Sequence, residues 1–471
     1  MSPRRTRIVA TLGPASAGEE TIDRLVAAGL DVARLNMAHT GAEDARRLTE
    51  RVRAAGAHHG RPVAVLADLA GPKLRLGTFT DGPVTLTAGE PFELVTTPTE
   101  GDSTRAFVDH EPLTSDVAVD QPILLNDGIV RLRVTGIGDG VVRTVVEAGG
   151  PIDDRKGVNL PASTVSAPAL TDKDREDLRT ALDIGVDLVS LSFVRAPDDA
   201  DAVRQAAGDA CPPVIAKIEK PQAVERLEEI IAAFDGVMVA RGDLGVEMDV
   251  GRVPLVQKRI IDEARRWSKP VIVATEMLES MVDASRPTRA EASDVANAVL
   301  DGADALMLSA ETSVGVDPVR VATTMSSIIE IVEDEADPPA APSPADGEAL
   351  PGALTAAGVE LGERIGARCL VASTTTGRSA QRLSAQRPRR PVVAVTPDEA
   401  VARRLALSWG VTAHAAPSVT TGEQLREFID GDLTATGLVA DGDLVVIVAG
   451  SGEGRPGSTD LVRIDRVGDR G

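Results

Sequence analysis

Short apolar runs alternate along this chain with longer segments in which apolar residues recur at helical spacing. Apolar runs rich in β-branched residues predict strands, and eight of them lie at 8–12, 32–36, 63–68, 188–193, 214–219, 237–241, 271–275 and 305–309. The segments between them predict helices. Segment 19–29 places Ile22, Leu25 and Val26 on one face, and 223–234 repeats apolar residues in the same way. This alternation predicts an α/β fold, a parallel (β/α)8 TIM barrel.

The alternation breaks between residues 72 and 168, where short alternating runs and turn glycines take over, as in NDGIVRLRVTGIGDG. This pattern predicts an antiparallel β-barrel domain inserted into the larger barrel, which would then comprise 1–71 and 169–335. Acidic residues, Pro and Ala fill 336–352, which we interpret as a linker. Runs at 369–374, 391–397 and 444–452, with a weaker one near 411–416, predict an open α/β domain over 353–471.

Composition narrows the class of protein. Hydrophobic residues make up 43% and charged residues 26% of the 471 residues, which is typical of a water-soluble globular chain. No apolar stretch reaches the roughly 18 residues of a membrane span, and we find no secretory signal. The two cysteines lie far apart and suit a reducing cytoplasm. A net charge of −22 repels nucleic acid and anionic membranes, so an anionic substrate needs a local cluster of positive charge.

Polar residues follow the predicted strands, at the end where barrels of this kind build their active sites. Residues two apart on a strand point the same way, so we expect Lys217 to share a direction with Glu219, and Arg241 with Asp243. Most of the strand-end residues could project into one mouth. They are Arg34, Asn36, Asp68, Ser192, Lys217, Glu219, Arg241, Asp243, Thr275, Ser309 and Glu311.

These residue types suit a phosphate and a divalent metal. The carboxylates of Glu219 and Asp243 are hard oxygen ligands that fit Mg2+ or Mn2+. The Arg34 guanidinium can hold a phosphate through two hydrogen bonds, and the Lys217 ammonium can stabilise a phosphoryl group in transfer. Ion pairs that stabilise the rim are the alternative for any single residue. The whole set on successive strands favours metal-dependent phosphoryl transfer.

At these residues the chain resembles the pyruvate kinase family. The matching segments run nearly end to end, and they include RIVATLGPAS, GPKLRLG, RKGVNLPA, VIAKIEKPQAVE, MVARGDLGVE and RPTRAEASDVANAVLDGADALMLSAET. The resemblance implies transfer of phosphate from phosphoenolpyruvate to ADP, which gives pyruvate and ATP in the final step of glycolysis. It also implies Mg2+ or Mn2+ as cofactor, a cytoplasmic homotetramer, and an inserted domain that closes as a lid over the barrel mouth.

The resemblance further implies roles for individual residues. Arg34 binds the substrate phosphate, Lys217 stabilises the transferring group, and Thr275 completes the catalytic set. Glu219 and Asp243 hold the divalent metal. The substrate is expected to meet Arg34, Lys217, Gly242, Asp243 and Thr275, and the nucleotide Asn36, His39, Arg75 and Lys156.

The chain departs from the family at its monovalent-cation site, which usually holds K+. Asn36 and Asp68 remain, but Ala38 and Leu69 replace a Ser and a Thr, and Lys73 replaces a common Glu. Two oxygen ligands are lost and a tethered ammonium is gained, so the chain resembles the potassium-independent branch. Lys73 could supply the missing charge and pair with Asp68. The alternative is K+ bound by Asn36, Asp68 and backbone carbonyls.

Two loops of small residues in the C-terminal domain correspond to the family's effector pocket for a sugar phosphate or a nucleotide. Turns kept small for packing remain the alternative. The candidate effector residues are Thr374, Thr376, Gly377, Arg378, Ser379 and Arg455. Two other functions also stay open: a different barrel enzyme acting on phosphoenolpyruvate or pyruvate, such as an aldolase, and a non-catalytic relative that only binds metabolites.

Overall fold

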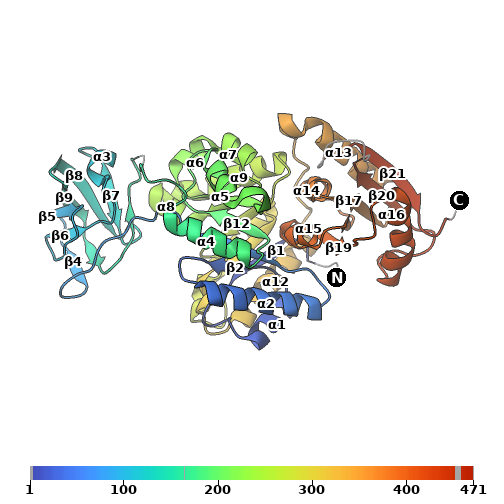
Figure 1. Ribbon diagram of the computed structural model, residues 1–471, viewed down its shortest axis with the longest axis horizontal. Coiled ribbons are helices and arrows are strands. Elements are labelled where there is room, and N and C mark those ends of the chain that lie inside the picture. The colour runs from blue at the N-terminus through green and yellow to red at the C-terminus, as the bar shows by residue number, and fades with distance from the viewer. Residues whose placement is uncertain (1–3, 164, 451–457, 470–471) are drawn as a thin grey trace.

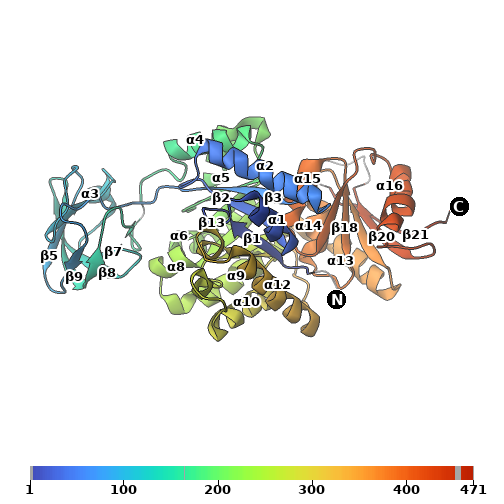
Figure 2. The ribbon, with the colours of Figure 1, turned by 90° about the horizontal axis from the view of Figure 1, so that it is seen from below.

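Three parts follow one another along the long axis of the molecule: a small β domain, a central barrel and a C-terminal α/β domain (Figure 1, Figure 2). The computed structural model describes residues 4–163, 165–450 and 458–469. The chain leaves the barrel after β3, builds the β domain and returns to the barrel at α4, so the β domain is an insertion, as predicted. No helix among the described residues is long and apolar enough to cross a membrane.

Eight parallel strands form the closed barrel, in the order β1-β16-β15-β14-β13-β12-β3-β2. This confirms the predicted (β/α)8 barrel, and each predicted run overlaps one strand. β3 is buried along its whole length, as expected for a parallel strand covered on both faces. The strands are β1 Arg7–Thr11, β2 Leu30–Asn36, β3 Ala64–Leu69, β12 Leu188–Leu191, β13 Val214–Ile218, β14 Gly236–Ala240, β15 Val271–Ala274 and β16 Ala305–Leu308.

Amphipathic helices cover the outside of the barrel. α1 buries Ile22, Leu25 and Val26, as the sequence predicts. The predicted helix over 223–234 is interrupted at Arg226, whose backbone leaves the helical region, and two shorter helices result. The helices of this part are α1 Glu19–Ala27, α2 Ala42–His58, α4 Asp172–Asp183, α5 Asp199–Ala207, α6 Pro221–Glu225, α7 Leu227–Ala233, α8 Arg241–Glu247, α9 Val253–Arg266, α10 Arg289–Asp301, α11 Ala310–Ser313 and α12 Pro318–Glu335.

The inserted domain packs its strands around an apolar core of its own, which includes Phe92 and Leu94. Its main sheet has the order β11-β7-β8-β9-β5-β6, and β10 and β4 form a separate pair. It differs from the predicted antiparallel barrel in two details: hydrogen bonding leaves the sheet open, and β5 and β6 run parallel. The elements are β4 Val84–Leu86, β5 Pro91–Val95, β6 Arg105–Phe107, α3 Leu113–Asp116, β7 Pro122–Leu125, β8 Val130–Gly138, β9 Val141–Ala148, β10 Gly150–Ile152 and β11 Val158–Asn159.

The C-terminal domain is an open five-stranded sheet in the order β19-β18-β17-β20-β21. Its edge strand β21 is antiparallel and was missed by the sequence prediction. The predicted linker is partly structured: α13 begins at Ala349, and the buried Ala345 donates its amide to the Arg266 carbonyl at 3.0 Å. The elements are α13 Ala349–Arg364, β17 Cys369–Ser373, α14 Arg378–Ala385, β18 Val392–Thr396, α15 Glu399–Arg404, β19 Val411–Ala415, α16 Gly422–Phe428, β20 Leu444–Ala449 and β21 Leu461–Arg466.

The C-terminal domain seals the end of the barrel at which the strands begin. Arg7, the first residue of β1, donates its Nε to the Ser408 carbonyl at 3.0 Å. Leu407 belongs to the same apolar cluster as Val32 and Met238 of the barrel strands. Because this end is closed by apolar packing, a functional site falls at the carboxyl ends of the strands.

Candidate active site

A buried charge cluster joins the carboxyl ends of β2, β3 and β13. Arg34 donates from Nε to Asp68 Oδ2 at 2.9 Å and from Nη1 to Thr11 Oγ1 at 2.8 Å. The Lys217 Nζ lies 3.5 Å from Asp68 Oδ2 and 3.0 Å from Glu219 Oε1. Lys217 and Glu219 therefore lie side by side, as strand alternation predicts. The Asp68 carboxylate binds both cations and so fixes their positions.

The charges in this cluster stabilise one another. Burial alone would raise the pKa of Asp68, but Lys217, Arg34 and a hydrogen bond from the Ser190 hydroxyl at 2.6 Å lower it overall. Burial likewise disfavours charge on Lys217, yet the carboxylates of Asp68 and Glu219 outweigh it and raise the pKa of that ammonium. Asp68 and Lys217 therefore both stay ionised at neutral pH.

Glu219 has the surroundings of a metal ligand. Its Oε2 accepts a hydrogen bond from the Phe193 amide at 2.7 Å, whereas its buried Oε1 has only the Lys217 ammonium beside it, at 3.0 Å and outside normal hydrogen-bond geometry. Burial raises the pKa of Glu219; the Lys217 ammonium opposes this shift without cancelling it, and the neighbouring charge of Asp243 adds to it. A divalent cation would complete the bonding of this oxygen and relieve the repulsion between the carboxylates. The donors present at Glu219 and Asp243 thus fit Mg2+.

Asp243 lies in the first turn of α8 and pairs with Lys73, at the base of the inserted domain. The Lys73 Nζ lies 3.3 Å from Asp243 Oδ1, and both side chains are partly exposed. The pairing of Lys73 with Asp68 considered from the sequence is therefore wrong. Asp68 is instead bound by Arg34 and Lys217, which reach it from the barrel interior.

Arg241 points away from Asp243, so the predicted common direction of these two residues is wrong. The reason is that β14 ends before Arg241 and α8 begins there, which replaces strand alternation by helical spacing. The Arg241 guanidinium donates to the carbonyls of Ala274 at 3.2 Å and Thr275 at 2.7 Å, and pairs with Asp294 at 2.7 Å. It therefore holds the backbone that follows β15.

That backbone is strained. Thr275 and Glu276 have φ angles of 70° and 55°, a region that β-branched residues rarely adopt. The Thr275 hydroxyl accepts a hydrogen bond from the Gly242 amide at 2.8 Å. Strain of this kind persists only where the surroundings enforce it, and it clusters at functional sites. Here the Arg241 guanidinium and the start of α8 fix the position of the Thr275 hydroxyl.

Glu311, which the sequence predicted to face the barrel mouth, does not do so. It is fully buried, and its two carboxylate oxygens accept hydrogen bonds from the amides of Leu278 at 3.1 Å and Ser309 at 2.6 Å. Glu311 therefore fastens two loops of the barrel rim to each other.

The expected nucleotide residues come from two parts of the molecule. Arg75 forms an antiparallel bridge with Gly157, which places it next to Lys156 at the base of the inserted domain. Asn36 ends β2 in the barrel, and His39 lies exposed just beyond it. The barrel and the inserted domain would therefore contribute to opposite sides of a nucleotide site.

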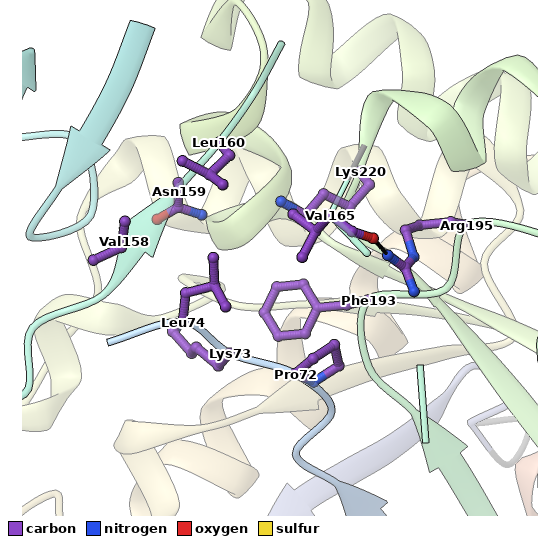
Figure 3. A pocket seen from close by; sticks show the side chains of 10 residues that line it. All are labelled: Pro72, Lys73, Leu74, Val158, Asn159, Leu160, Val165, Phe193, Arg195 and Lys220. Atoms are coloured by element: carbon purple, nitrogen blue, oxygen red, sulfur yellow. Dashed lines mark hydrogen bonds between the residues drawn. The ribbon is translucent and has the colours of Figure 1, made fainter. Parts of the chain in front are cut away.

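A narrow cavity lies where the inserted domain joins the barrel, with the Phe193 ring among its lining residues (Figure 3). Asn159 of β11 donates to Glu247 Oε1 at 2.7 Å, and Lys220 pairs with the same buried carboxylate. The Asn159 bond anchors the inserted domain to α8, and the Lys220 pair joins α8 to the start of α6 within the barrel. The sequence prediction missed Asn159, Lys220 and Glu247, because their segments are far apart in the chain. The cavity is lined by Pro72, Lys73, Leu74, Val158, Asn159, Leu160, Val165, Phe193, Arg195 and Lys220.

In the C-terminal domain, the candidate effector residue Arg378 is already engaged. It donates to the carbonyls of Ser268 at 3.2 Å and Trp267 at 3.3 Å, and it pairs with Glu348. Burial lowers the pKa of Arg378, although Glu348 opposes this shift. Arg378 thus connects the start of α14 to the end of α9 in the barrel.

The other candidate effector residues differ in accessibility. Thr374 is buried and accepts a hydrogen bond from the Gly377 amide at 2.9 Å, whereas Thr376 is exposed. Ser379 is buried, with its hydroxyl 2.8 Å from that of Thr459. Arg455 lies outside the described residues.

A closed (β/α)8 barrel with a buried lysine, arginine and carboxylate cluster at its mouth, and with a β domain inserted beside it, defines a barrel phosphotransferase. The family profile "Pyruvate kinase, barrel domain" matches residues 3–322, and "Pyruvate kinase, alpha/beta domain" matches residues 352–465. The chain belongs to the pyruvate kinase family.

Individual pyruvate kinases are similar to this chain over nearly its full length. The chain is 50% identical to a pyruvate kinase of Mycobacterium intracellulare over 472 residues, covering 99% of both chains. It is 47% identical to a pyruvate kinase of Corynebacterium glutamicum, covering 99% of this chain and 98% of the relative. The crystal structure of a pyruvate kinase from Cryptosporidium parvum matches with a TM-score of 0.91 at 32% identity, covering 98% of this chain and 96% of that one. The predicted family is confirmed, and the aldolase alternative is wrong.

Proposed function

We propose that this chain transfers the phosphoryl group of phosphoenolpyruvate to ADP and so forms pyruvate and ATP. The observation that carries the proposal is the Lys217 ammonium, held between Asp68 and Glu219 at the mouth of a pyruvate kinase barrel. Family membership supplies the substrates, and the charge cluster supplies groups suited to the chemistry.

Each residue of the mouth has a role in this proposal. Lys217 stabilises the negative charge of the phosphoryl group during transfer, because its ammonium is held in place before the reaction begins. Arg34 binds the phosphate of the substrate beside it. Glu219 and Asp243 would hold Mg2+, which when bound supplies positive charge next to the substrate oxygens.

The carboxylate side of the substrate is assigned to the turn after β15. The Thr275 hydroxyl and the Gly242 amide lie together there, hydrogen-bonded at 2.8 Å, and Arg241 holds the backbone behind them. A substrate carboxylate would replace the Thr275 hydroxyl as the acceptor of the hydrogen bond from the Gly242 amide. The Thr275 hydroxyl would then lie near the enolate carbon that must gain a proton.

The inserted domain would act as a lid. Arg75 and Lys156 on the lid, with Asn36 and His39 on the barrel, would bind the nucleotide phosphates from two sides. Closure would bring these sides together and exclude water, which could otherwise accept the phosphoryl group. The anchoring of Asn159 to Glu247 supports a hinge at the base of the lid.

We also propose that the activity does not require K+. The Asp68 carboxylate already accepts hydrogen bonds from Ser190 and Arg34 and contacts Lys217, so its charge is compensated without an added cation. Leu69 is buried and offers no side-chain oxygen. Lys73, beside Asp243, supplies a fixed positive charge at the mouth.

Regulation and assembly remain further proposals. A sugar phosphate or a nucleotide bound at residues 374–379 would act next to Arg378, whose bonds to Trp267 and Ser268 offer a physical connection to the barrel. Exposed apolar side chains such as Val250 and Leu255, at 73% and 69% of their full exposure, support association of chains into the homotetramer that the family implies.

A coupled assay of pyruvate formation tests the main proposal. We expect turnover with phosphoenolpyruvate, ADP and Mg2+, at the same rate in K+ and in tetramethylammonium. Substrate binding without turnover would favour the non-catalytic alternative instead. A large loss of rate in tetramethylammonium would contradict potassium independence but not the proposed reaction.

Regulation and assembly have separate tests. Adding sugar phosphates or AMP to the assay tests regulation, and light scattering of the purified protein measures the number of chains in the oligomer.

A further inference from the structure

Two adjacent histidines at the end of α2 reach the same carboxylate oxygen on α1. The His58 Nδ1 lies 2.7 Å from Asp23 Oδ1, and the His59 Nε2 lies 3.1 Å from it. Within the part of the chain that the structure describes, these residues are the one group of three His, Cys, Asp or Glu side chains whose ligand atoms all lie within 4.8 Å of one another. We call Asp23, His58 and His59 the α1–α2 cluster.

The donors of the α1–α2 cluster match a transition-metal ion. Two imidazole nitrogens and one carboxylate oxygen are common ligands of Zn2+, with bonds of about 2.0–2.2 Å. Atoms at the corners of a tetrahedron of that size lie roughly 3.4 Å apart. The observed 2.7 Å and 3.1 Å contacts are slightly shorter, so small side-chain rotations would admit the ion. A water molecule would complete the tetrahedron.

The position of the cluster also favours a cation. His58 is the last residue of α2, and carbonyl groups at the carboxyl end of a helix carry partial negative charge. Asp23 adds a full negative charge from α1. Because His58 is largely exposed and His59 and Asp23 are partly exposed, hydrogen bonds alone hold these side chains together only weakly, and a cation would hold them more firmly.

The α1–α2 cluster lies away from the proposed reaction site. α2 leads into β3, so its end lies where the barrel strands begin, opposite the mouth. Figure 1 shows α1 and α2 together in blue on the barrel, far from the inserted domain. The nitrogen donors also differ in kind from the carboxylates of Glu219 and Asp243, which suit Mg2+.

We propose that Asp23, His58 and His59 form a second metal site, for Zn2+ or a cation of similar ligand preference, that fastens α1 to α2. This site is independent of the proposed transfer of phosphate. Ion binding there stabilises the folded barrel without entering the reaction.

Equilibrium dialysis of the full-length protein against Zn2+, with Mg2+ saturating, tests the proposal. We expect one tightly bound zinc per chain and a zinc-dependent rise in the thermal midpoint. In the double variant His58→Ala, His59→Ala, zinc affinity should fall at least tenfold and the rise in midpoint should vanish. Turnover measured without zinc should not change, which also shows that the variant is folded.

Two further variants make the result specific. Asp44→Asn removes another exposed carboxylate of α2 and should leave zinc binding intact. Cys211→Ser removes a partly buried thiol that could bind zinc by itself, and it should also have no effect. The proposal is overturned if the wild-type chain binds no zinc, if the double variant binds it as tightly, or if Cys211→Ser abolishes binding.

Discussion

The ammonium of Lys73 lies 3.3 Å from the Oδ1 of Asp243, one of the two proposed metal ligands. Lys73 belongs to the base of the inserted domain and Asp243 to the first turn of α8, so the pair spans the junction of lid and barrel. A positive charge fixed at this point would lie beside the proposed metal and the phosphate of the proposed substrate. This position supports the proposal that the Lys73 ammonium takes the place of a monovalent cation.

Exchanging three residues should create a requirement for K+. In the variant Ala38→Ser, Leu69→Thr, Lys73→Glu, two oxygen ligands return and the tethered charge is lost. We expect its rate in K+ to exceed that in tetramethylammonium by at least about tenfold, or roughly 1.4 kcal/mol in activation free energy. The ratio for the wild-type chain should be near one. The single variant Lys73→Met is the control: it should be slower in both salts, because it lacks the ligands that K+ needs. Equal rates of the triple variant in both salts would contradict the assigned role of Lys73.

Replacing Lys217 by Met should leave the fold intact and lower kcat by about 10^3, or roughly 4 kcal/mol, because the charge acts mainly in the transition state. The KM for phosphoenolpyruvate should change much less. Steady-state kinetics and circular dichroism measure both effects. Lys258→Met is a matched control, since the half-exposed Lys258 pairs with Asp301 on the outside of the barrel. Near-normal turnover of the Lys217 variant would refute the proposed role.

Arg241 should matter for rate through Thr275, although it is not itself expected to touch the substrate. Arg241→Met removes the donors to the Ala274 and Thr275 carbonyls, which hold the strained turn at Thr275 and Glu276, and we expect kcat to fall by about 10^2. Arg241→Lys should recover part of the loss, because an ammonium can still reach one carbonyl. Arg320→Met, at an exposed pair with Asp317, serves as the control. Full activity of Arg241→Met would show that the turn keeps its shape without the hydrogen bonds from Arg241.

Acid stability should depend on Asp31, which is buried with Arg4 at 2.7 Å and Arg61 at 3.0 Å. Burial alone would raise the pKa of Asp31, but Arg4, Arg7 and Arg61 lower it below its usual value of 3.8. A lowered folded-state pKa gives stability that is present above the unfolded-state pKa and is lost as the pH falls through the folded-state pKa.

Asp31→Asn should therefore lower the free energy of unfolding by about 3–5 kcal/mol at neutral pH, because it leaves the buried arginines without their carboxylate partner. The difference in urea midpoint between this variant and the wild type should narrow below about pH 4. Asp44→Asn, at an exposed pair with Arg47, should change the free energy of unfolding by less than about 1 kcal/mol. A difference for Asp31→Asn that is the same at every pH would contradict the assigned protonation state.

The sequence by itself determined the architecture and most of the proposed transfer centre. Every barrel strand was predicted, because strands buried on both faces read as continuous apolar runs. The carboxyl ends of those strands carry Arg34, Asp68, Lys217 and Glu219, and barrel closure brings consecutive strand ends to one mouth. Alternation along a strand was sufficient to place Lys217 beside Glu219.

Only the tertiary structure decided the partners of residues that lie beyond the strands. Lys73 pairs with Asp243 rather than Asp68, Arg241 turns to the carbonyl of Thr275, and Arg378 bonds to the barrel. The physical reason is that alternation stops where a strand ends, and the following backbone can turn in several directions. Which direction is taken depends on hydrogen bonds and charges from segments far apart in the chain, and these meet only when the domains pack together.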